Sequence, residues 1–140
     1  MRVLGIDLGD ERTGLAFSDP TGTIAGETLV IAEWDEGRLC EKICALAAER
    51  GVVRIALGLP LNMDGSRGVR AQKSERFAAL LEDRSGLPVK LWDERRTTAE
   101  AHRILAEAGQ NGKRRKKTVD AVAASLILEG YLAFLNSGNR

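Results

Sequence analysis

The feature that most constrains the fold is the opening of the chain, where an apolar run carries one acidic residue. The run from Val3 to Leu8 reads VLGIDL, and Asp7 is its single charged position. A glycine-containing turn leads into a second apolar run, from Gly14 to Ser18, so the two runs predict a buried β-hairpin. Burying an ionised carboxylate without a partner is costly. Asp7 is therefore expected to pair, to bind a cation or to shift its pKa, and it is the first candidate functional residue.

Two classes of protein begin in this way. Acidic, metal-dependent nucleases of the RNase H type hold Mg²⁺ with an aspartate on the first strand. Actin-like sugar kinases and chaperone ATPases use an Ile-Asp-Leu-Gly hairpin to bind phosphate, but they bind nucleotide between two domains. The 140 residues of this chain suffice for one domain. Length therefore favours the nuclease class and predicts a single domain over residues 1–140.

The charge of the chain is balanced overall but uneven along the sequence. Twenty-one basic and twenty acidic residues give a formal net charge of +1. Six acidic and two basic residues lie between Glu27 and Glu49, whereas eight basic and two acidic residues lie between Arg95 and Lys117. This distribution predicts a basic end, and a local positive potential can attract a polyanion even when the net charge is near zero.

The number and position of cysteine, histidine and apolar residues argue against a disulfide-bonded, zinc-binding or membrane-spanning protein. Cys40 and Cys44 follow a helical pattern and are expected to be reduced core residues. A single histidine leaves a zinc site without ligands. No export signal is recognised, and the apolar runs are expected to fall short of the roughly 20 residues of a membrane span. We therefore expect a cytoplasmic protein that is not bound to a membrane.

Periodicity and glycine or proline punctuation predict the order of the elements. The expected strands cover residues 2–8, 14–18, 24–31, 52–57 and 89–92. The expected helices cover residues 35–50, 69–84, 97–109 and 118–135, with a basic loop at 112–117 before the last. An antiparallel meander followed by right-handed crossovers predicts an α/β fold with a mixed five-stranded sheet, in the order βββαβαβαα, flanked by helices.

Three acidic positions stand where acidity is unfavourable for folding. Asp7 lies within the first strand, Asp93 and Glu94 end the last strand, and Asp120 lies in the first turn of the final helix. In the expected topology the first and last strands flank the fourth, and the final helix crosses them. The carboxylates could then converge, and converging oxygen ligands select Mg²⁺ or Mn²⁺. Two such ions suit phosphodiester hydrolysis.

Each of these residues also has a purely structural interpretation. Asp7 could bond backbone amides of the hairpin, and Asp120 could simply complement the helix dipole. The pair Asp93–Glu94 could be a solvent-exposed strand end. The presence of all three positions in this order favours a shared site.

The alternation of side chains along a strand does not decide whether Asp93 or Glu94 is the third member of the site. Adjacent strand residues point to opposite faces, and both faces of a central strand are expected to be apolar. Glu94 is preferred because its longer side chain reaches a metal more easily from a strand end. Asp93 is then expected either to support the metal-binding residues from behind or to form an ion pair with Arg95 or Arg96.

Basic and neutral polar residues gather near these positions. Arg67 and Arg70 follow the glycine-containing loop, and a run of five basic residues precedes Asp120. Such a run is usually a solvated loop, but beside a phosphodiester-cleaving centre it favours nucleic-acid contact, which would give affinity without sequence readout. The candidate nucleic-acid-binding residues are Arg12, Asn62, Ser66, Arg67, Arg95, Arg96, Lys113, Arg114, Arg115, Lys116 and Lys117.

Four motifs in this order resemble one family, the YqgF (RuvX) family of small RNase H-like nucleases. They are GIDLGDERTGLAFSD from Gly5, GLPLNMDGS from Gly58, DERRTTAEA from Asp93 and VDAVAASLIL from Val119. The resemblance implies a fold related to Holliday-junction resolvases, a cytoplasmic location and, for bacterial members, maturation of the 5′ end of 16S rRNA. By motif match, Asp7, Glu94 and Asp120 would be the catalytic, metal-binding carboxylates.

Three functions remain open at this stage. The first is a Mg²⁺-dependent nuclease (a hydrolase) acting on structured precursor rRNA, with ribosomal particles as a further partner. The second is a Holliday-junction resolvase, and the third is a non-catalytic nucleic-acid-binding factor of ribosome assembly. No sequence feature predicts an oligomeric state.

Overall fold

The computed structural model describes residues 1–96 and 112–137, with side chains in the second range described from Val119 onward. The strands are β1 (Arg2–Asp7), β2 (Arg12–Ser18), β3 (Ala25–Ala32), β4 (Val52–Leu59) and β5 (Val89–Asp93). The helices are α1 (Glu36–Glu49), α2 (Val69–Ser85), the short 3-10 helix η1 (Glu94–Arg96) and α4 (Gly112–Asn136). The five strands form one sheet in the order β3-β2-β1-β4-β5. The predicted α/β fold with a mixed five-stranded sheet is confirmed.

The sheet combines an antiparallel meander with a parallel half. β1 pairs antiparallel with β2, which pairs antiparallel with β3, while β1, β4 and β5 run parallel. The expectation that β1 and β5 flank β4 is confirmed. β5 itself lies at the edge of the sheet, so its description as a central strand was wrong. Because β1, β4 and β5 are parallel, their carboxyl ends lie along one border of the sheet. Ligands of α/β sheets commonly bind at the carboxyl ends of strands.

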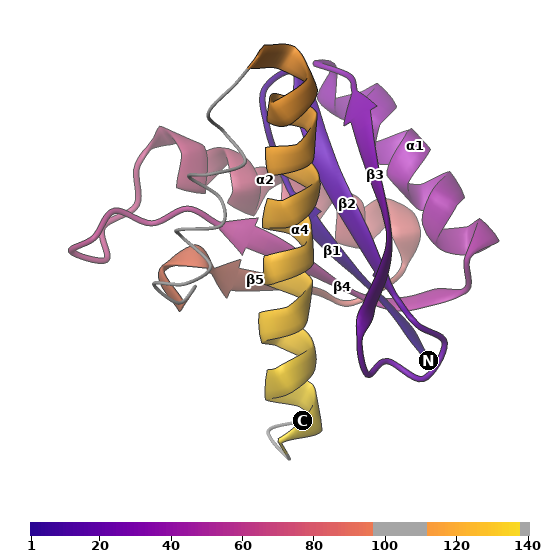
Figure 1. Ribbon diagram of the computed structural model, residues 1–140. Helices are drawn as coiled ribbons and strands as arrows, with labels where there is room; N and C mark the ends of the chain where they lie inside the picture. The colour runs from indigo at the N-terminus through magenta and orange to yellow at the C-terminus, as the bar shows by residue number, and fades with distance from the viewer. Residues whose placement is uncertain (97–111, 138–140) are drawn as a thin grey trace.

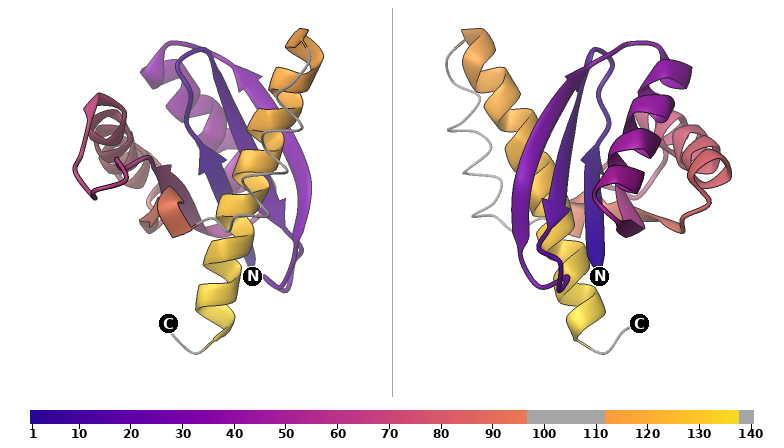
Figure 2. Two further views of the ribbon diagram at one scale, coloured as in Figure 1. Left: turned by 60° about the vertical axis from the view of Figure 1, so that its left-hand side comes forward. Right: turned by 90° about the vertical axis from the view of Figure 1, so that its right-hand side faces the viewer.

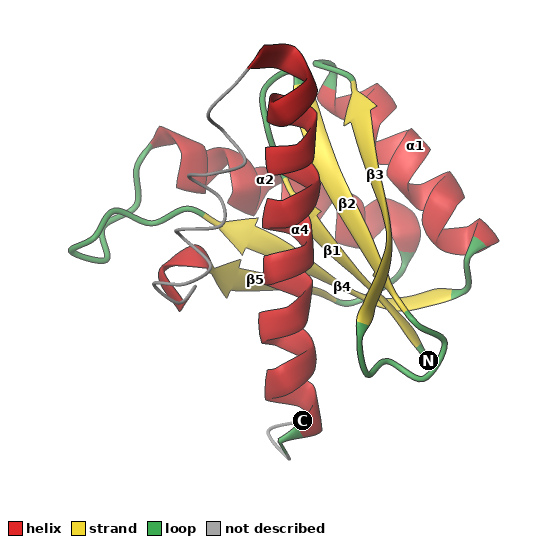
Figure 3. Cartoon of the chain, viewed as in Figure 1, coloured by secondary structure: helices red, strands yellow, loops and turns green. Residues whose placement is uncertain are grey.

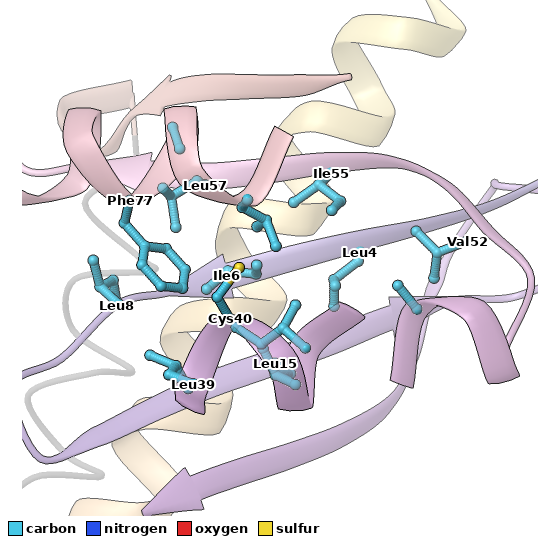
Figure 4. Packing of buried hydrophobic residues seen from close by; sticks show 14 of the residues in the cluster. Leu4, Ile6, Leu8, Leu15, Leu39, Cys40, Val52, Ile55, Leu57 and Phe77 are labelled. Atoms are coloured by element: carbon cyan, nitrogen blue, oxygen red, sulfur yellow. The ribbon is translucent and has the colours of Figure 1, made fainter. Parts of the chain in front are cut away.

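Helices cover both faces of the sheet. Figures 1 and 2 show α4 crossing one face and α1 and α2 on the other. On the α1/α2 side, alternate strand residues such as Leu4, Ile6 and Leu57 pack with Leu39 and Phe77 (Figure 4). Because successive strand residues point to opposite faces, the residues between them face α4.

Where β1, β2 and β4 pass under the middle of α4, the sheet presents small residues. Ala16 and Ala56 are fully buried there against Ala124 and Leu128. A Cβ atom on Gly5 of β1 would lie 2.7 Å from the Cβ of Leu128, which is too close for any real pair. The small side chains therefore let α4 lie directly on the backbone of the sheet (Figure 3).

The start of α4 differs from the expectation. The helix begins at Gly112, so residues 113–117 belong to its first turns and do not form a basic loop. Lysine and arginine have high helix propensity, and a helix already held by its apolar face can extend through them. The helix expected over residues 97–109 lies outside the described residues.

Part of α4 also corrects the expectation about membrane spans. By length and hydropathy alone, Val119–Asn136 could cross a membrane. In this structure the segment contributes Ala124, Leu128, Leu132 and Leu135 to the core on one face of the sheet. A core helix passes the same test of length and composition, so the hydropathy of α4 is explained by its packing.

Smaller boundary differences bear on the site. Asp7 is the last residue of β1 and not an interior one. β4 does not break at Gly58 but continues to Leu59, with Gly58 paired to Trp92. Glu94 begins η1, a turn that was not expected. Cys40 and Cys44 are free thiols, buried and half-buried on α1, as expected.

Candidate active site

Asp7 and Asp120 lie on the same side of the sheet, although they are remote in sequence. Asp7 follows Ile6, which faces α1 and α2, so its side chain is on the α4 side. Its partner across the hairpin is Gly14. The backbone carbonyl of Asp120 lies so close to Gly14 that a Cβ atom there would overlap it. The first strand and the last helix are therefore joined at these residues.

Glu94 reaches the same side from the end of β5. Trp92 packs into the core under α4, and Glu94 follows it by two residues. One carboxylate oxygen of Glu94, Oε2, lies 3.0 Å from the position that a Cβ atom on Gly58 would take. The same Cβ would lie 2.7 Å from Cδ1 of Ile127 on α4. Because residue 58 is glycine, Glu94 and Ile127 can both occupy the space over β4, next to β1.

The charges of Glu94 and Asp120 both act on Asp7. The pKa of Asp7 is raised to about 7, mainly by burial and in addition by the charges of Glu94 and Asp120, while the charge of Arg70 lowers it. Burial also raises the pKa of Glu94, while Arg70 lowers it and Asp93 raises it. Raised carboxylate pKa values in a shared site are typical of functional centres.

Asp120 is paired with a basic residue. The Nε atom of Arg12, the first residue of β2, donates to Oδ2 of Asp120 at 3.1 Å. An open cavity of about 330 Å³ lies beside this pair, lined by Gly9, Asp10, Glu11, Arg12 and Asp120. Arg12 was expected to contact nucleic acid, and in this structure its partner is a candidate metal ligand.

The donor set can be compared with the needs of a metal ion. Within residues 1–96 and 112–137, no three His, Cys, Asp or Glu side chains lie close enough together to hold a metal as they stand. The chemistry of the donors nevertheless fits a hard divalent cation, because Asp7, Glu94 and Asp120 offer oxygen ligands whose mutual repulsion a cation would relieve. To bind the ion, Asp120 would have to give up its hydrogen bond from Arg12.

Asp93 and Glu94 have different surroundings. Asp93 accepts hydrogen bonds from the backbone and the guanidinium of Arg95, with Nη2 2.8 Å from Oδ2. This contact lowers the pKa of Asp93. The ion pair predicted for Asp93 is therefore confirmed, and the carboxylate that acts on Asp7 is that of Glu94. The assignment of Glu94 as a metal ligand stays a prediction.

The loop between β4 and α2 is held by its own polar side chains. Asn62 donates from Nδ2 to Oγ of Ser66 at 2.9 Å, and that hydroxyl donates to Asp64 at 2.6 Å. Nη1 of Arg95 donates to the carbonyl of Met63 at 3.4 Å, which ties the loop to η1. Asn62 and Ser66 were expected to contact phosphate, and here they shape the loop that borders the site.

The remaining candidate basic residues lie before α2, in η1 after β5, and at the start of α4. Arg67 pairs with Glu75 at 2.9 Å. The guanidinium of Arg96 lies over the ring of Trp92, 4.5 Å from its centroid, and 5.8 Å from that of Phe134. Residues 113–117 lie on the first turns of α4, and their side chains are outside the described part of the chain.

One residue outside the candidate set acts on the carboxylates. Arg70, in the first turn of α2, lowers the pKa of both Asp7 and Glu94. A cation near a helix N-terminus is disfavoured by the helix dipole. Arg70 was already expected among the basic residues that follow the glycine-containing loop, and its unfavourable placement is a further signal that it acts on the acidic site.

Comparisons with known proteins identify a family and several relatives. The family model described as "RuvX: Holliday junction resolvase" matches residues 1–134. A relative from Halothermothrix orenii, named "Putative pre-16S rRNA nuclease", is 46% identical over 97% of each chain. A relative of the same name from Listeria innocua is 43% identical and covers 97% of this chain and 100% of its own length.

Solved structures share the fold at low sequence identity. T. thermophilus RuvC in complex with a Holliday junction substrate covers 98% of this chain and 97% of its own, with a TM-score of 0.63 and 15% identity. The Fowlpox virus resolvase, in complex with Holliday junction DNA, covers 96% and 99%, with a TM-score of 0.61 and 12% identity. These likenesses establish the RNase H-like fold of the resolvases, and the match over residues 1–134 shows that the chain belongs to the RuvX family.

Proposed function

We propose that this protein is a metal-dependent nuclease that hydrolyses phosphodiester bonds in the 5′-end processing of precursor 16S rRNA. Membership of the RuvX family supports nuclease chemistry, and the names of the curated relatives support the rRNA substrate. The observation that carries the proposal is Asp7, whose pKa is raised to about 7 by burial and by the charges of Glu94 and Asp120. A buried carboxylate on which two further carboxylate charges act suits the binding of cations.

The carboxylates have distinct tasks in this proposal. Asp7, Glu94 and Asp120 would hold two Mg²⁺ or Mn²⁺ ions, which when bound supply activation of the attacking water and stabilisation of the leaving oxygen. Asp7 holds a proton below about pH 7 in the metal-free protein, so protons and cations compete for it. Catalysis is therefore expected to weaken as the pH falls.

Basic residues around the site would position the nucleic acid. The charge of Arg70 acts on both Asp7 and Glu94, so it can also attract a phosphate placed between them. Arg67, Arg95 and Arg96 border the same edge, and residues 113–117 begin the helix that carries Asp120. Contacts of this kind bind phosphate without reading sequence. Such a protein would act in the cytoplasm, on precursor rRNA or on ribosomal particles.

A second candidate function is resolution of Holliday junctions. It is favoured by the shared fold with T. thermophilus RuvC and the Fowlpox resolvase, both solved with junction DNA. Symmetric cleavage of two strands requires two active sites related by symmetry, hence a dimer.

A cleavage assay separates these functions. Purified protein would be incubated with Mg²⁺ or Mn²⁺ and with three substrates, namely a 16S rRNA precursor fragment with its 5′ extension, a four-way DNA junction and a linear DNA duplex. We expect metal-dependent cleavage of the RNA near the mature 5′ end. Symmetric nicking of the junction with no RNA cleavage would instead favour the resolvase.

Matched variants locate the activity in the proposed site. Asp7→Asn should abolish cleavage, whereas Asp83→Asn, an exposed carboxylate on α2, should leave it unchanged. Nucleic-acid binding without cleavage, equal in the wild-type protein and Asp7→Asn, would favour a non-catalytic role in ribosome assembly.

A further inference from the structure

The ion pair between Arg12 and Asp120 connects the hairpin turn of β1 and β2 to α4. The two residues are 108 positions apart in sequence, and Nε of Arg12 lies 3.1 Å from Oδ2 of Asp120. Their side chains are 30% and 22% exposed, respectively. Arg12 thus neutralises a proposed metal ligand while part of its guanidinium remains accessible to solvent.

This pairing distinguishes Asp120 from the other two carboxylates. In the described part of the chain, Asp7 and Glu94 form no ion pair. The basic residue that acts on both is Arg70, whose charge lowers their pKa values without a direct bond. Arginine keeps its charge at every accessible pH. A cation that binds to Asp120 must therefore compete with Arg12.

The space beside the pair is large enough for a phosphate group, and its lining combines one guanidinium with three carboxylates. The cavity of about 330 Å³ is lined by Arg12 together with Gly9, Asp10, Glu11 and Asp120. Lys73 pairs with Asp10 at 2.8 Å and offsets one of these acidic charges. Guanidinium groups bind phosphate through two parallel hydrogen bonds, so a phosphate at this cavity would draw Arg12 toward itself.

We propose that Arg12 alternates between Asp120 and a phosphate of the bound nucleic acid, so that substrate binding frees Asp120 to hold a divalent cation. The inference rests on the proposed function and adds to it a coupling between substrate and metal. Linkage makes this coupling reciprocal: nucleic acid tightens the binding of metal by the same factor by which metal tightens the binding of nucleic acid. Arg12 is in this sense a positioning residue, which acts on the metal through Asp120.

Calorimetric titration of Mn²⁺ tests the coupling without measuring cleavage. The titration would be made with the wild-type protein and with Arg12→Met, each alone and with an RNA duplex rendered uncleavable by 2′-O-methyl and phosphorothioate groups. For the wild-type protein we expect the duplex to tighten Mn²⁺ binding about fivefold or more. In Arg12→Met, Mn²⁺ should bind more tightly without RNA, and the effect of the duplex should fall below about twofold.

A matched variant separates this exchange from a general change of charge. Arg70→Met also removes one positive charge that acts on Asp7 and Glu94, but Arg70 does not bond to Asp120. It should therefore raise the affinity for Mn²⁺ both without the duplex and at saturating duplex, and the ratio of the two affinities should stay well above the twofold limit expected for Arg12→Met. Arg12→Gln, which can still donate a hydrogen bond to Asp120, replaces Arg12→Met if circular dichroism shows the latter to be unfolded.

The outcomes distinguish this inference from the proposed function. If Mn²⁺ binds in an Asp7-dependent manner but the duplex tightens it equally in the wild-type protein and Arg12→Met, the exchange by Arg12 is wrong and the metal site stands. If Mn²⁺ binding to the wild-type protein is absent both with and without RNA, the proposed function and the inference fail together.

Discussion

The backbone carbonyl of Asp120 lies directly against Gly14, leaving no room for a Cβ atom at that position. Gly14 is also the partner of Asp7 across β1 and β2. One glycine therefore sets how closely the helix that carries Asp120 approaches the strand that carries Asp7. Because this contact involves backbone on both sides, side-chain rotation cannot relieve it.

Gly14→Ala should displace the start of α4 and separate Asp120 from Asp7. We expect a loss of about 1–3 kcal/mol in the free energy of unfolding, as for other overpacked sites, and a fall in cleavage rate of about 100-fold from misplacement of the site. Urea denaturation and single-turnover kinetics measure the two effects. Gly26→Ala is the control, because a Cβ atom there would lie 3.4 Å from its nearest neighbour, the carbonyl of Phe17.

Asp7→Asn should abolish metal-dependent cleavage and leave the fold intact, because the side chain keeps its shape and loses a charge. The same change should stabilise the metal-free protein at pH 8, where Asp7 is ionised against the repulsion of Glu94 and Asp120. A pKa displaced from 3.8 to about 7 corresponds to roughly 4 kcal/mol, which sets the upper limit of the expected rise in the free energy of unfolding. Mg²⁺-dependent turnover retained by this variant would exclude the proposed centre.

The pH dependence of stability gives a separate test of Asp7. A carboxyl group with a raised pKa binds more protons in the folded than in the unfolded protein, so stability falls as the pH rises between the two values. For the metal-free wild-type protein we expect this loss between about pH 4 and pH 7. Chemical denaturation across this range should show a flatter profile for Asp7→Asn, and identical profiles would contradict the burial of this charge.

Glu94→Gln should reduce cleavage far more than Asp93→Asn, with both proteins folded. Glu94 acts on Asp7, whereas Asp93 is occupied by Arg95. Loss of Asp93 should loosen Arg95 and the loop that it contacts, with a modest effect on turnover. The cleavage rates of the two variants would be measured side by side, with circular dichroism to check that both are folded. A larger loss of rate in Asp93→Asn than in Glu94→Gln would assign the catalytic role to Asp93.

Neutralising residues Lys113, Arg114, Arg115, Lys116 and Lys117 to Gln should weaken nucleic-acid binding about equally for all sequences. The slope of log Kd against log salt concentration should flatten by about 0.7–0.9 for each phosphate that the protein no longer neutralises. Fluorescence anisotropy over a range of KCl concentrations measures it. Neutralising Arg38 and Lys42 of α1, which pair with Glu33, provides the control. A slope unchanged by the five substitutions would remove this segment from the interface.

Local pattern in the sequence was sufficient to predict most of the fold. Short apolar runs with glycine and proline punctuation predicted the five strands, because such runs depend on neighbours in the chain. The meander and the rule of right-handed crossovers predicted the mixed sheet. The prediction that residues 112–117 form a loop was wrong, since a run of lysine and arginine is compatible with either a solvated loop or the first turns of a helix. Packing of the apolar part of α4 decides between them.

The sequence by itself determined which residues are candidates for the chemistry: acids at Asp7 and Asp120, and an Asp93–Glu94 pair at a strand end. The tertiary structure decided how they are partnered. The ion pair of Arg12 with Asp120 and the influence of Arg70 on Asp7 and Glu94 join residues far apart in the chain. Such contacts depend on where α4 and α2 lie against the sheet, and that placement is set by the small residues beneath α4 and by the pairing of strands, which no local pattern encodes.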